Sequence, residues 1–477
     1  MNRLADNGKV HEWTDADVAA ALPAPASEGR GTTQQVRELL NRIRSRVFKK
    51  EKTLQARWQK ALNEYGWAHV VPTDSVKYLH GAVVNASNDA SNKAPDLSRM
   101  PSDTAATVDN VELIKTAGAV MVVTALELKA TDVSLDDLDS RGQVANYGAR
   151  ILVSQPWRLF VVVGLYNGHK LWLARCTPDE SDGCVLQQSR LFDVHEDFEL
   201  CVRFVHALLH GPPEALGWVR PTLEGVGPLR IVRRLGKGAT SAVYEAVASA
   251  GVHYAVKVMG RRQDLERTLL ASEKATLEGL HRLLAISQPG VRALVPVPVA
   301  LLADDRVLVM TPVGRPLAGG RLTAAMVASL VELLRIVHAN YVHRDLRLSN
   351  LLQTEDGRLL VIDWGYAAPV ARAAAPAGAV WHSPAHILQA AIDRRMYVTA
   401  AADDLRTLLR VCYLDRRGVS APKGEYDVVR DFWVGAIARP EWTAWGGAAA
   451  EEAALRTVDG RPDYDGFREH LQRLVQD

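Results

Sequence analysis

The residues best suited to carry chemistry lie in the stretch YVHRDLRLSNLLQTEDGRLLVIDWGYA, Tyr341 to Ala367. Asp345 precedes Asn350 by five residues, and Asp363 ends the apolar run that follows. Transfer of a γ-phosphoryl group needs Mg²⁺ to neutralise developing charge, and Mg²⁺ prefers oxygen ligands such as the Asp363 carboxylate and the Asn350 amide. Asp345 is then a candidate base for a substrate hydroxyl, and Arg347 a cation that offsets charge near the transferred phosphate.

A glycine-containing turn and a lysine-bearing strand precede this stretch, in RLGKGATSAVYEAVASAGVHYAVKVM. Gly236 and Gly238 would let backbone N–H groups approach nucleotide phosphates without obstruction by a side chain. Lys257 follows on an apolar strand, where its ammonium group can hold phosphate oxygens as a point charge. Taken alone, the glycines also fit an ordinary hairpin turn, and the later residues favour the nucleotide-binding interpretation.

A helical segment after the lysine strand, DLERTLLASEKATLEGLHRLL, offers a carboxylate that could pair with Lys257 and fix its reach. Glu273 is the preferred partner because it lies one turn before an apolar stripe, as a helix facing the lysine strand would need. Glu266 and Glu278 are the competing candidates on the same segment.

These motifs together make residues 226 to about 420 similar to the protein kinase fold. The resemblance implies binding of ATP and Mg²⁺ and gives each residue above its expected role. It adds Val243 to the Gly-rich loop and Asp404 as the helix carboxylate that braces the catalytic loop. Two positions depart from the family pattern: Trp364 replaces the Phe of DFG, and Ala385 replaces the Glu of APE, which normally pairs with an Arg.

The segment between Asp363 and Pro384 is short and rich in alanine, and its hydroxyl residues are Tyr366 and Ser383. No Ser or Thr stands where an added phosphate could order the segment against Arg344. The sequence therefore predicts a kinase without an activation-loop phosphorylation switch.

Four functions are compatible with these residues. Arg347, two residues after Asp345, favours a Ser/Thr protein kinase, as do the HRD motif and the helix carboxylate Asp404. Trp364 directly after Asp363 favours a small-molecule phosphotransferase of the aminoglycoside-kinase kind. The other two are a Mg²⁺-dependent nuclease regulated by a pseudokinase and a catalytically silent interaction protein.

A second set of polar residues lies in the front half of the chain. Asp96 in KAPDLSRM precedes the strand-like ALELKA, in which Glu127 and Lys129 share one face because strand side chains alternate. Two carboxylates can hold Mg²⁺, and a nearby lysine can help to activate water, which is the chemistry of metal-assisted phosphodiester cleavage. Gln143 follows at the start of the helix-like GQVANYGARIL.

This set resembles the PD-(D/E)xK nuclease superfamily over residues 60 to 205. Followed by the kinase motifs, it is similar to the arrangement in fungal-type protein kinases and the kinase-bearing Crinkler effectors, although no Crinkler targeting motif is present. The front domain is either an active nuclease or a degenerate fold kept for binding. The expected fold is α+β or α/β in two domains: an N-terminal restriction-endonuclease-like α/β core and a C-terminal bilobal protein-kinase-like fold.

Composition along the chain divides it into four regions. We expect a flexible tail over residues 1–33, a nuclease-like domain over 34–211, a Pro- and Gly-rich linker over 212–225 and a kinase-like domain over 226–477. One basic helix is predicted from Val36 to Lys60, where nine Lys or Arg and two Glu give a local charge of +7. That helix is either a solvated face or a contact for a nucleic-acid backbone or a membrane surface.

The whole chain of 477 residues has a net charge of only +2, so overall charge indicates no particular partner. Its four cysteines lack the spacing of a zinc site and are expected to be reduced. No apolar run long enough for a signal peptide or a membrane span is present, so we expect a cytoplasmic or nuclear protein without a membrane partner. The protein substrate is not identified by the sequence.

Overall fold

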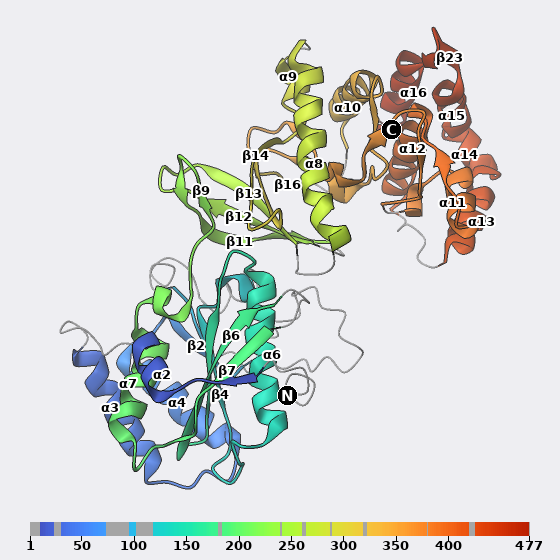
Figure 1. Cartoon of the computed structure of the whole chain (residues 1–477). Helices are drawn as coiled ribbons and strands as arrows, with labels where there is room; N and C mark the ends of the chain where they lie inside the picture. Colours follow the sequence, from blue (N-terminus) through green and yellow to red (C-terminus); the bar gives the residue numbers. More distant parts are fainter. Residues whose placement is uncertain are drawn as a thin grey trace. The chain divides into compact units, whose positions relative to one another are not determined.

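The computed structural model of the chain is mixed α/β and divides into two compact units (Figure 1). Unit 1 comprises Met1–Glu266 with Leu302–Val307, and unit 2 comprises Arg267–Leu301 with Leu308–Asp477. The predicted linker over residues 212–225 falls inside unit 1, and the predicted domain boundaries stay predictions. The structure describes residues 10–22, 30–72, 95–101, 118–179, 184–238, 241–259, 264–286, 289–317, 322–378, 380–418 and 425–476.

The larger sheet of unit 1 has eight strands in the order β1-β7-β6-β5-β4-β3-β2, with β8 paired to β6. β4 is parallel to β5 and β1 to β7, and the other pairs are antiparallel. Every residue of β4 and β5 is buried, as expected for central strands covered on both faces. The strands are β1 Val10–Glu12, β2 Val70–Pro72, β3 Leu97–Arg99, β4 Thr124–Leu128, β5 Val161–Tyr166, β6 Lys170–Pro178, β7 Cys184–Gln188 and β8 Phe192–Asp193.

β5 and β6 form an antiparallel hairpin with Asn167 and Gly168 in its turn, and an Asn-Gly pair is favoured in such turns. Gly168 has φ of 94°, a left-handed conformation that glycine adopts without steric cost. The Asn167 side-chain oxygen accepts hydrogen bonds from the backbone N–H groups of His169 at 3.1 Å and Lys170 at 2.8 Å. The turn therefore sets the register of the two strands.

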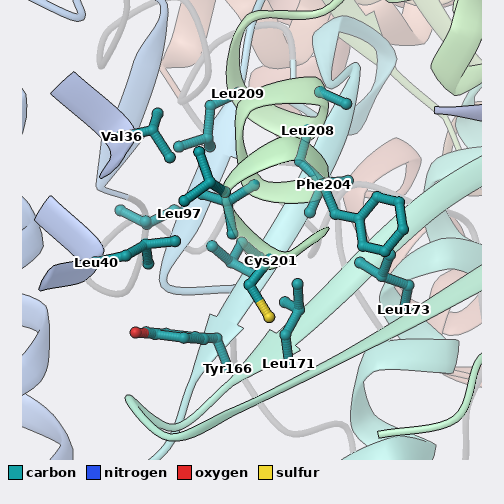
Figure 2. Close-up of a cluster of buried hydrophobic side chains, with 14 of the residues drawn as sticks. Val36, Leu40, Leu97, Tyr166, Leu171, Leu173, Cys201, Phe204, Leu208 and Leu209 are labelled. Carbon is teal, nitrogen blue, oxygen red and sulfur yellow. The ribbon is translucent and has the colours of Figure 1, made fainter. Parts of the chain in front are cut away.

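Helices cover both faces of the sheet, with α3, α4 and α7 on one side and α6 on the other (Figure 1). Figure 2 shows apolar side chains of α3 and α7 meeting those of β3 and β6 in the larger core of the unit. The predicted helix after Gln143 is confirmed as part of α6. The helical segments are α2 Asp15–Ala21, α3 Arg30–Arg44, α4 Glu51–Tyr65, η3 Gly118–Met121, α6 Leu138–Ser154, α7 Phe198–His210 and η4 Pro213–Leu216.

The predicted flexible tail differs from the structure where residues 10–22 are described. β1 pairs with β7, and α2 follows with Thr14 as its N-cap. Trp13, Val18 and Leu22 are fully or almost fully buried in the core of the unit. Three apolar side chains in a short segment were enough to anchor it against the sheet; residues 1–9 and 23–29 lie outside the described ranges.

The single basic helix predicted from Val36 to Lys60 is wrong, because the structure has two helices there, α3 and α4. The break between the helices is held by Thr131, which follows β4. Phe48 N–H donates to Thr131 Oγ1 at 2.9 Å, and Thr131 N–H donates to the Phe48 carbonyl oxygen at 2.9 Å. Phe48 itself is buried. Tertiary hydrogen bonds therefore replace the helical ones at this position.

Unit 1 also contains a short hairpin and three antiparallel strands that carry the Gly-rich loop residues. The hairpin β9–β10 is followed by β11, β12 and β13, in which β12 pairs with both neighbours. The Met259 N–H group, at the end of β13, donates to the Arg306 carbonyl oxygen at 2.9 Å. The bounds are β9 Thr222–Leu223, β10 Gly227–Pro228, β11 Arg230–Lys237, β12 Ser241–Val247 and β13 His253–Met259.

Unit 2 is mainly helical, with short strand pairs between its helices. α10, α12, α15 and α16 pack together, and α11 packs against α13. Its helical segments are α8 Asp264–Leu283, which begins in unit 1, then η5 Leu284–Ile286, α9 Pro289–Arg292, α10 Ala324–Val337, η7 Leu348–Asn350, η8 Trp364–Tyr366, η9 Val380–His382, α11 Ala385–Ile392, α12 Ala401–Arg417, α13 Tyr426–Ile437, α14 Pro440–Ala444, α15 Gly447–Leu455 and α16 Tyr464–Gln476.

The strands of unit 2 include two antiparallel pairs that frame the catalytic stretch, β17 with β20 and β18 with β19. β16 pairs with β18, β21 with β22 and β23 with β24. The strands are β14 Val297–Leu302, β15 Val307–Thr311, β16 Arg315–Pro316, β17 Tyr341–Val342, β18 Leu351–Gln353, β19 Leu359–Val361, β20 Ala368–Pro369, β21 Ala373–Ala374, β22 Tyr397–Val398, β23 Thr457–Val458 and β24 Arg461–Pro462.

The described ranges contain no helix that is both long and apolar enough to cross a membrane. The four cysteines are buried free thiols, in agreement with the prediction that they are reduced. The compartment expected from the sequence stays a prediction.

Candidate functional sites

The front-half residues predicted to act together are in contact in unit 1. Glu127 lies on the central strand β4, and Lys129 follows the end of that strand. The Lys129 ammonium nitrogen is 2.7 Å from Glu127 Oε1, so the two side chains lie on one face as their spacing predicts. Glu127 is buried and Lys129 is largely so.

Asp96 reaches the same place from the residue before β3. β3 and β4 are antiparallel with Leu97 opposite Leu126, which brings Asp96 to the carboxyl end of β4. There Asp96 Oδ2 accepts the Leu128 N–H group at 2.6 Å. A side-chain carboxylate thus takes the place of a backbone carbonyl at this end of the strand.

Gln143, in the first turns of α6, joins the two charged residues of β4. Its amide nitrogen donates to Glu127 Oε1 at 2.9 Å, and its carbonyl oxygen accepts from Lys129 Nζ at 3.2 Å. Its amide nitrogen also lies 2.5 Å from the Tyr147 hydroxyl one turn further along α6. We call Asp96, Glu127, Lys129 and Gln143 the acidic centre; all four are residues that the sequence indicates.

Two residues that contact the acidic centre were missed by sequence reasoning, and both lie on α4. Gln55 donates a hydrogen bond to Asp96 Oδ1, and Glu51 Oε2 lies 3.6 Å from Lys129 Nζ. Their spacing of one helical turn places both on the face of α4 that meets β4. The signal in the sequence was weak, because an acidic residue and a glutamine one turn apart occur on most surface helices.

Burial dominates the electrostatics of the centre. It raises the pKa of Asp96 to about 8, together with the negative charge of Glu127, against the hydrogen bond from Leu128 N–H. Burial also raises the pKa of Glu127, although the positive charge of Lys129 opposes it. The pKa of Lys129 is raised, because the carboxylates of Glu127 and Glu51 outweigh the effect of its own burial. The centre therefore favours cationic partners for its carboxylates.

The donor set of the centre fits a hard divalent cation. Glu127 Oε2 is a buried oxygen without a hydrogen-bond partner among the described residues, which is costly unless a cation or a proton binds there. Asp96 supplies the second carboxylate. Within the described ranges no group of three His, Cys, Asp or Glu side chains is arranged to hold an ion. Mg²⁺ is commonly held by one or two carboxylates with substrate phosphates and water as its other ligands.

The residues predicted to contact nucleotide phosphates lie side by side on β11, β12 and β13. Gly236 pairs with Val243, and Val243 pairs with Lys257, so the three residues form one row across the strands. Directly opposed residues share a face of a sheet, which puts the half-buried Lys257 beside Val243. A Cβ atom at Gly236 would meet no described heavy atom within 4 Å. Packing therefore does not require glycine at 236.

The turn between β11 and β12 is closed by Gly238 N–H, which donates to the Ser241 carbonyl oxygen at 2.7 Å. Residues 239 and 240, at the tip of the predicted Gly-rich loop, lie outside the described ranges.

In unit 2 the predicted catalytic loop brings Asp345 and Asn350 together. The Asn350 amide nitrogen donates to Asp345 Oδ2 and to the Asp345 carbonyl oxygen, both at 2.9 Å. This fixes the orientation of the Asn350 amide, and its Oδ1 accepts no hydrogen bond from a described donor. Arg347 Nε lies 3.4 Å from Asp345 Oδ2. The three residues predicted to serve base, metal and charge roles are therefore neighbours.

Asp363 is linked to the loop through the backbone. Ile362, the residue before Asp363, donates its backbone N–H to the Asn350 carbonyl oxygen at 3.0 Å. This bond holds the backbone at Asp363 close to Asn350. Asp363 has φ of 67°, a left-handed conformation that Asp tolerates better than most residues. The next residue, Trp364, is fully buried and meets His343 edge to face at 4.4 Å between ring centroids. A tryptophan thus fills the position where Phe was expected.

Asp404, on α12, braces the catalytic loop as the resemblance implies. Its carboxylate accepts the backbone N–H groups of His343 at 2.6 Å and Arg344 at 2.9 Å, and it lies 3.0 Å from His338 Nε2. Burial opposes ionisation of Asp404, but these interactions outweigh it and lower its pKa. Arg344 has φ of 70°, a strained conformation for a residue other than glycine. The hydrogen bond from its N–H group to the Asp404 carboxylate helps to hold it.

Glu273 lies on α8, is buried, and is near Gly365, the second residue after Asp363. A Cβ atom at Gly365 would lie 3.5 Å from Glu273 Oε2. Lys257 belongs to unit 1 and Glu273 to unit 2, and the pairing of these two residues stays a prediction. The side chain of the competitor Glu266 lies outside the described part of α8, and Glu278 pairs with Lys274.

The segment after Asp363 is held by Arg344. Its guanidinium donates to the carbonyl oxygens of Tyr366, at 3.0 Å, and Ala375, and to the Tyr397 hydroxyl at 3.1 Å. Donors that would meet an added phosphate are thus occupied by the backbone of the segment itself.

The loss of the APE glutamate at Ala385 is accompanied by other contacts. Buried Arg410 donates to the Ser383 carbonyl oxygen and lies 4.9 Å from the Trp433 ring centroid. Trp433 Nε1 donates to the Trp381 carbonyl oxygen at 2.6 Å. These bonds tie the end of the segment to α12 and α13.

Comparisons with models of known protein families and with curated proteins identify no match for this chain.

Proposed function

We propose that the chain is an ATP- and Mg²⁺-dependent protein kinase of the Ser/Thr type, with a restriction-endonuclease-like domain in front of a bilobal kinase-like domain. The observation that carries the proposal is the catalytic loop, in which Asn350 holds Asp345 and Asp404 holds the backbone of the loop. The row of Gly236, Val243 and Lys257 supports nucleotide binding. The combination is that of the fungal-type and Crinkler-type kinases that the sequence resembles.

In the proposed reaction a Ser or Thr hydroxyl oxygen forms a bond to the γ-phosphorus of ATP. The bond from that phosphorus to the bridging oxygen breaks, and ADP leaves with the electron pair. Asp345 accepts the hydroxyl proton, and Arg347 offsets negative charge near the transferred group. Asn350 Oδ1 and the Asp363 carboxylate would hold Mg²⁺, which when bound neutralises charge on the phosphate oxygens.

The substrate class can be tested with Asp345→Asn, which keeps the side-chain size and removes the base. We expect the wild type to transfer labelled phosphate to Ser or Thr of a generic protein substrate, and the variant to lose at least a hundredfold in rate while it still binds ATP. Phosphate transfer to an aminoglycoside but to no protein would favour the small-molecule phosphotransferase instead. Equal rates for both proteins would contradict the role of Asp345.

We further propose that the acidic centre cleaves phosphodiester bonds with Mg²⁺. This second function is favoured by the contact of Glu127 with both Lys129 and Gln143 and by the unpartnered oxygen Glu127 Oε2. Asp96 and Glu127 would hold the cation, which when bound supplies charge to offset the phosphate. Lys129 would orient the attacking water, whose oxygen bonds to phosphorus as the bond to the leaving oxygen breaks. The leaving oxygen takes the electron pair of that bond, and the proton lost by the water neutralises it through solvent.

Nucleic acid is the proposed partner of unit 1. Exposed cationic side chains follow the chain from the end of α3 into α4, and they suit a phosphate backbone: Arg46, Lys49, Lys50, Lys52, Arg57 and Lys60. Incubation of plasmid DNA and of RNA with the wild type and with Glu127→Gln tests the activity. We expect cleavage that needs Mg²⁺ and is lost in the variant. Binding without cleavage by either protein would indicate a degenerate fold kept for binding.

A further inference from the structure

The two oxygens of Asp96 are both occupied by donors of the protein. Oδ2 accepts the Leu128 backbone N–H group at 2.6 Å, and Oδ1 accepts the side-chain amide of Gln55. Glu127 differs, because Oε1 accepts from Lys129 and Gln143, whereas Oε2 is buried and has no hydrogen-bond partner in the described part of the chain. One carboxylate of the acidic centre is therefore open to a ligand, and the other is closed by Gln55.

The orientation of the Gln55 amide follows from its two neighbours. Its Nε2 donates to Asp96 Oδ1 and, at 3.2 Å, to Glu51 Oε1. In both contacts the Gln55 NH₂ group is the donor and a carboxyl oxygen is the acceptor, so the NH₂ group and not the carbonyl oxygen faces the centre. An N–H group and a divalent cation both present positive charge to the same oxygen, and they therefore compete for it.

The helix that carries Gln55 is anchored by its other face. Leu54 and Trp58 of α4 are fully buried, and the Trp58 ring meets Tyr166 edge to face at 5.9 Å between centroids. Gln55 itself is only half-buried. Its side chain can therefore turn away from Asp96 by a change of rotamer, whereas α4 cannot move without loss of core packing.

We propose that Gln55 is a built-in competitor for the divalent cation at Asp96, a side-chain latch that sets the metal affinity of the acidic centre. The proposal rests on the metal-dependent function proposed above for that centre. With the latch in place, Asp96 exchanges one hydrogen-bond donor for the cation when the site is loaded. Without Gln55, Asp96 Oδ1 loses no hydrogen bond from that side chain when the cation binds.

The test is a calorimetric titration of the full chain with Mn²⁺ and with Mg²⁺. All proteins carry Asp363→Ala, which removes the proposed metal ligand of unit 2. Gln55→Ala is compared with the parent, and Ala maintains or improves helix propensity at this position. Gln59→Ala is the matched control, because Gln59 lies one turn along α4 and, among the described residues, its side chain bonds to Asn63 and not to the acidic centre. Glu127→Gln reports whether the acidic centre binds the cation.

We expect Gln55→Ala to bind the cation at least tenfold more tightly than the parent, Gln59→Ala to match the parent, and Glu127→Gln to lose the binding. Unchanged or weaker binding in Gln55→Ala, with binding still lost in Glu127→Gln, would overturn the latch and leave the metal centre standing. Binding that does not depend on Glu127, or no binding in any of the proteins, would overturn the metal centre itself.

Discussion

At the scale of single residues, Asp404 is the carboxylate on which the catalytic loop depends most. It accepts two backbone N–H groups, and hydrogen bonds to a charged acceptor contribute about 1.5–3 kcal/mol each. We expect Asp404→Ala to lower the free energy of unfolding of unit 2 by about 3 kcal/mol and to abolish phosphate transfer. Urea unfolding and a transfer assay measure both effects.

Asp403 provides the matched control for this prediction, since it is a buried neighbour on α12. Its carboxylate accepts the Ala400 N–H group and lies 3.1 Å from His386, and within the described ranges it makes no hydrogen bond to the loop that contains Asp345. Asp403→Ala should cost stability but retain transfer. Loss of transfer in both variants to the same degree would contradict a specific role for Asp404.

A histidine cluster in unit 1 predicts instability in acid. Burial, and then the neighbouring charges of His69, His206 and Arg99, lower the pKa of His210 to about 2. Its ring lies 5.0 Å from that of His69 and 5.4 Å from that of His206. A histidine that stays neutral in the fold does not lower the free energy of unfolding when the pH is above its unfolded pKa of about 6.5. As the pH drops below that value, the unfolded chain takes up the proton and the free energy of unfolding falls.

We expect each histidine of this cluster that stays neutral in the fold to cost about 1 kcal/mol when the pH is lowered to about one unit below the unfolded pKa. The change His210→Leu should reduce this acid-dependent loss of stability, because it removes one titrating group. It breaks no hydrogen bond of His210 Nε2, which has no partner among the described residues. Thermal unfolding at neutral and acidic pH checks this, with exposed His11→Leu as control. An unchanged pH dependence in His210→Leu would refute the role of the cluster.

Sequence reasoning located the main site residues but not all of them. Asp96, Glu127, Lys129 and Gln143 were predictable because strand alternation and motif spacing are local properties. Gln55 was not, because its bond to Asp96 joins residues 41 positions apart and depends on how α4 packs against the sheet. The same holds for the hydrogen bond from Arg344 Nε to the Tyr397 hydroxyl, because Tyr397 lies 53 positions away.

At the scale of elements, the segment after Asp363 is held in place without phosphate. Arg344 already binds the carbonyl oxygens of Tyr366 and Ala375. We therefore expect phosphatase treatment to leave transfer activity unchanged and Arg344→Ala to lower it at least tenfold. Exposed Arg372→Ala, in the same segment, should have little effect. A stoichiometric phosphate in this segment that raises activity, found by mass spectrometry, would be the contrary result.

Elements with strong local signals were predictable, and those fixed by distant contacts were not. The β5–β6 hairpin follows from Asn167-Gly168, and α6 from its apolar periodicity. The break between α3 and α4 depends on bonds between Phe48 and Thr131, which lie 83 positions apart. β1 and α2 were missed because a short segment gains its order from burial against the sheet and not from its own propensity.

At the scale of the whole molecule, the proposed activities use different residues. The acidic centre lies entirely in unit 1, whereas Asp345, Asn350 and Asp363 lie in unit 2. We expect Glu127→Gln to leave phosphate transfer within twofold of the wild type, and Asp363→Ala to leave plasmid cleavage equally unaffected. Assays of both activities on both variants check this. Loss of both activities in either variant would show that the two centres depend on each other.

The most direct measurement is Mg²⁺-dependent transfer of labelled phosphate from ATP to the protein itself and to a generic Ser/Thr substrate, with wild type and Asp363→Ala compared. The account predicts transfer by the wild type, and its loss in a variant that remains folded. Transfer that persists in Asp363→Ala, or no transfer from a folded wild type that binds ATP, would contradict the proposed kinase.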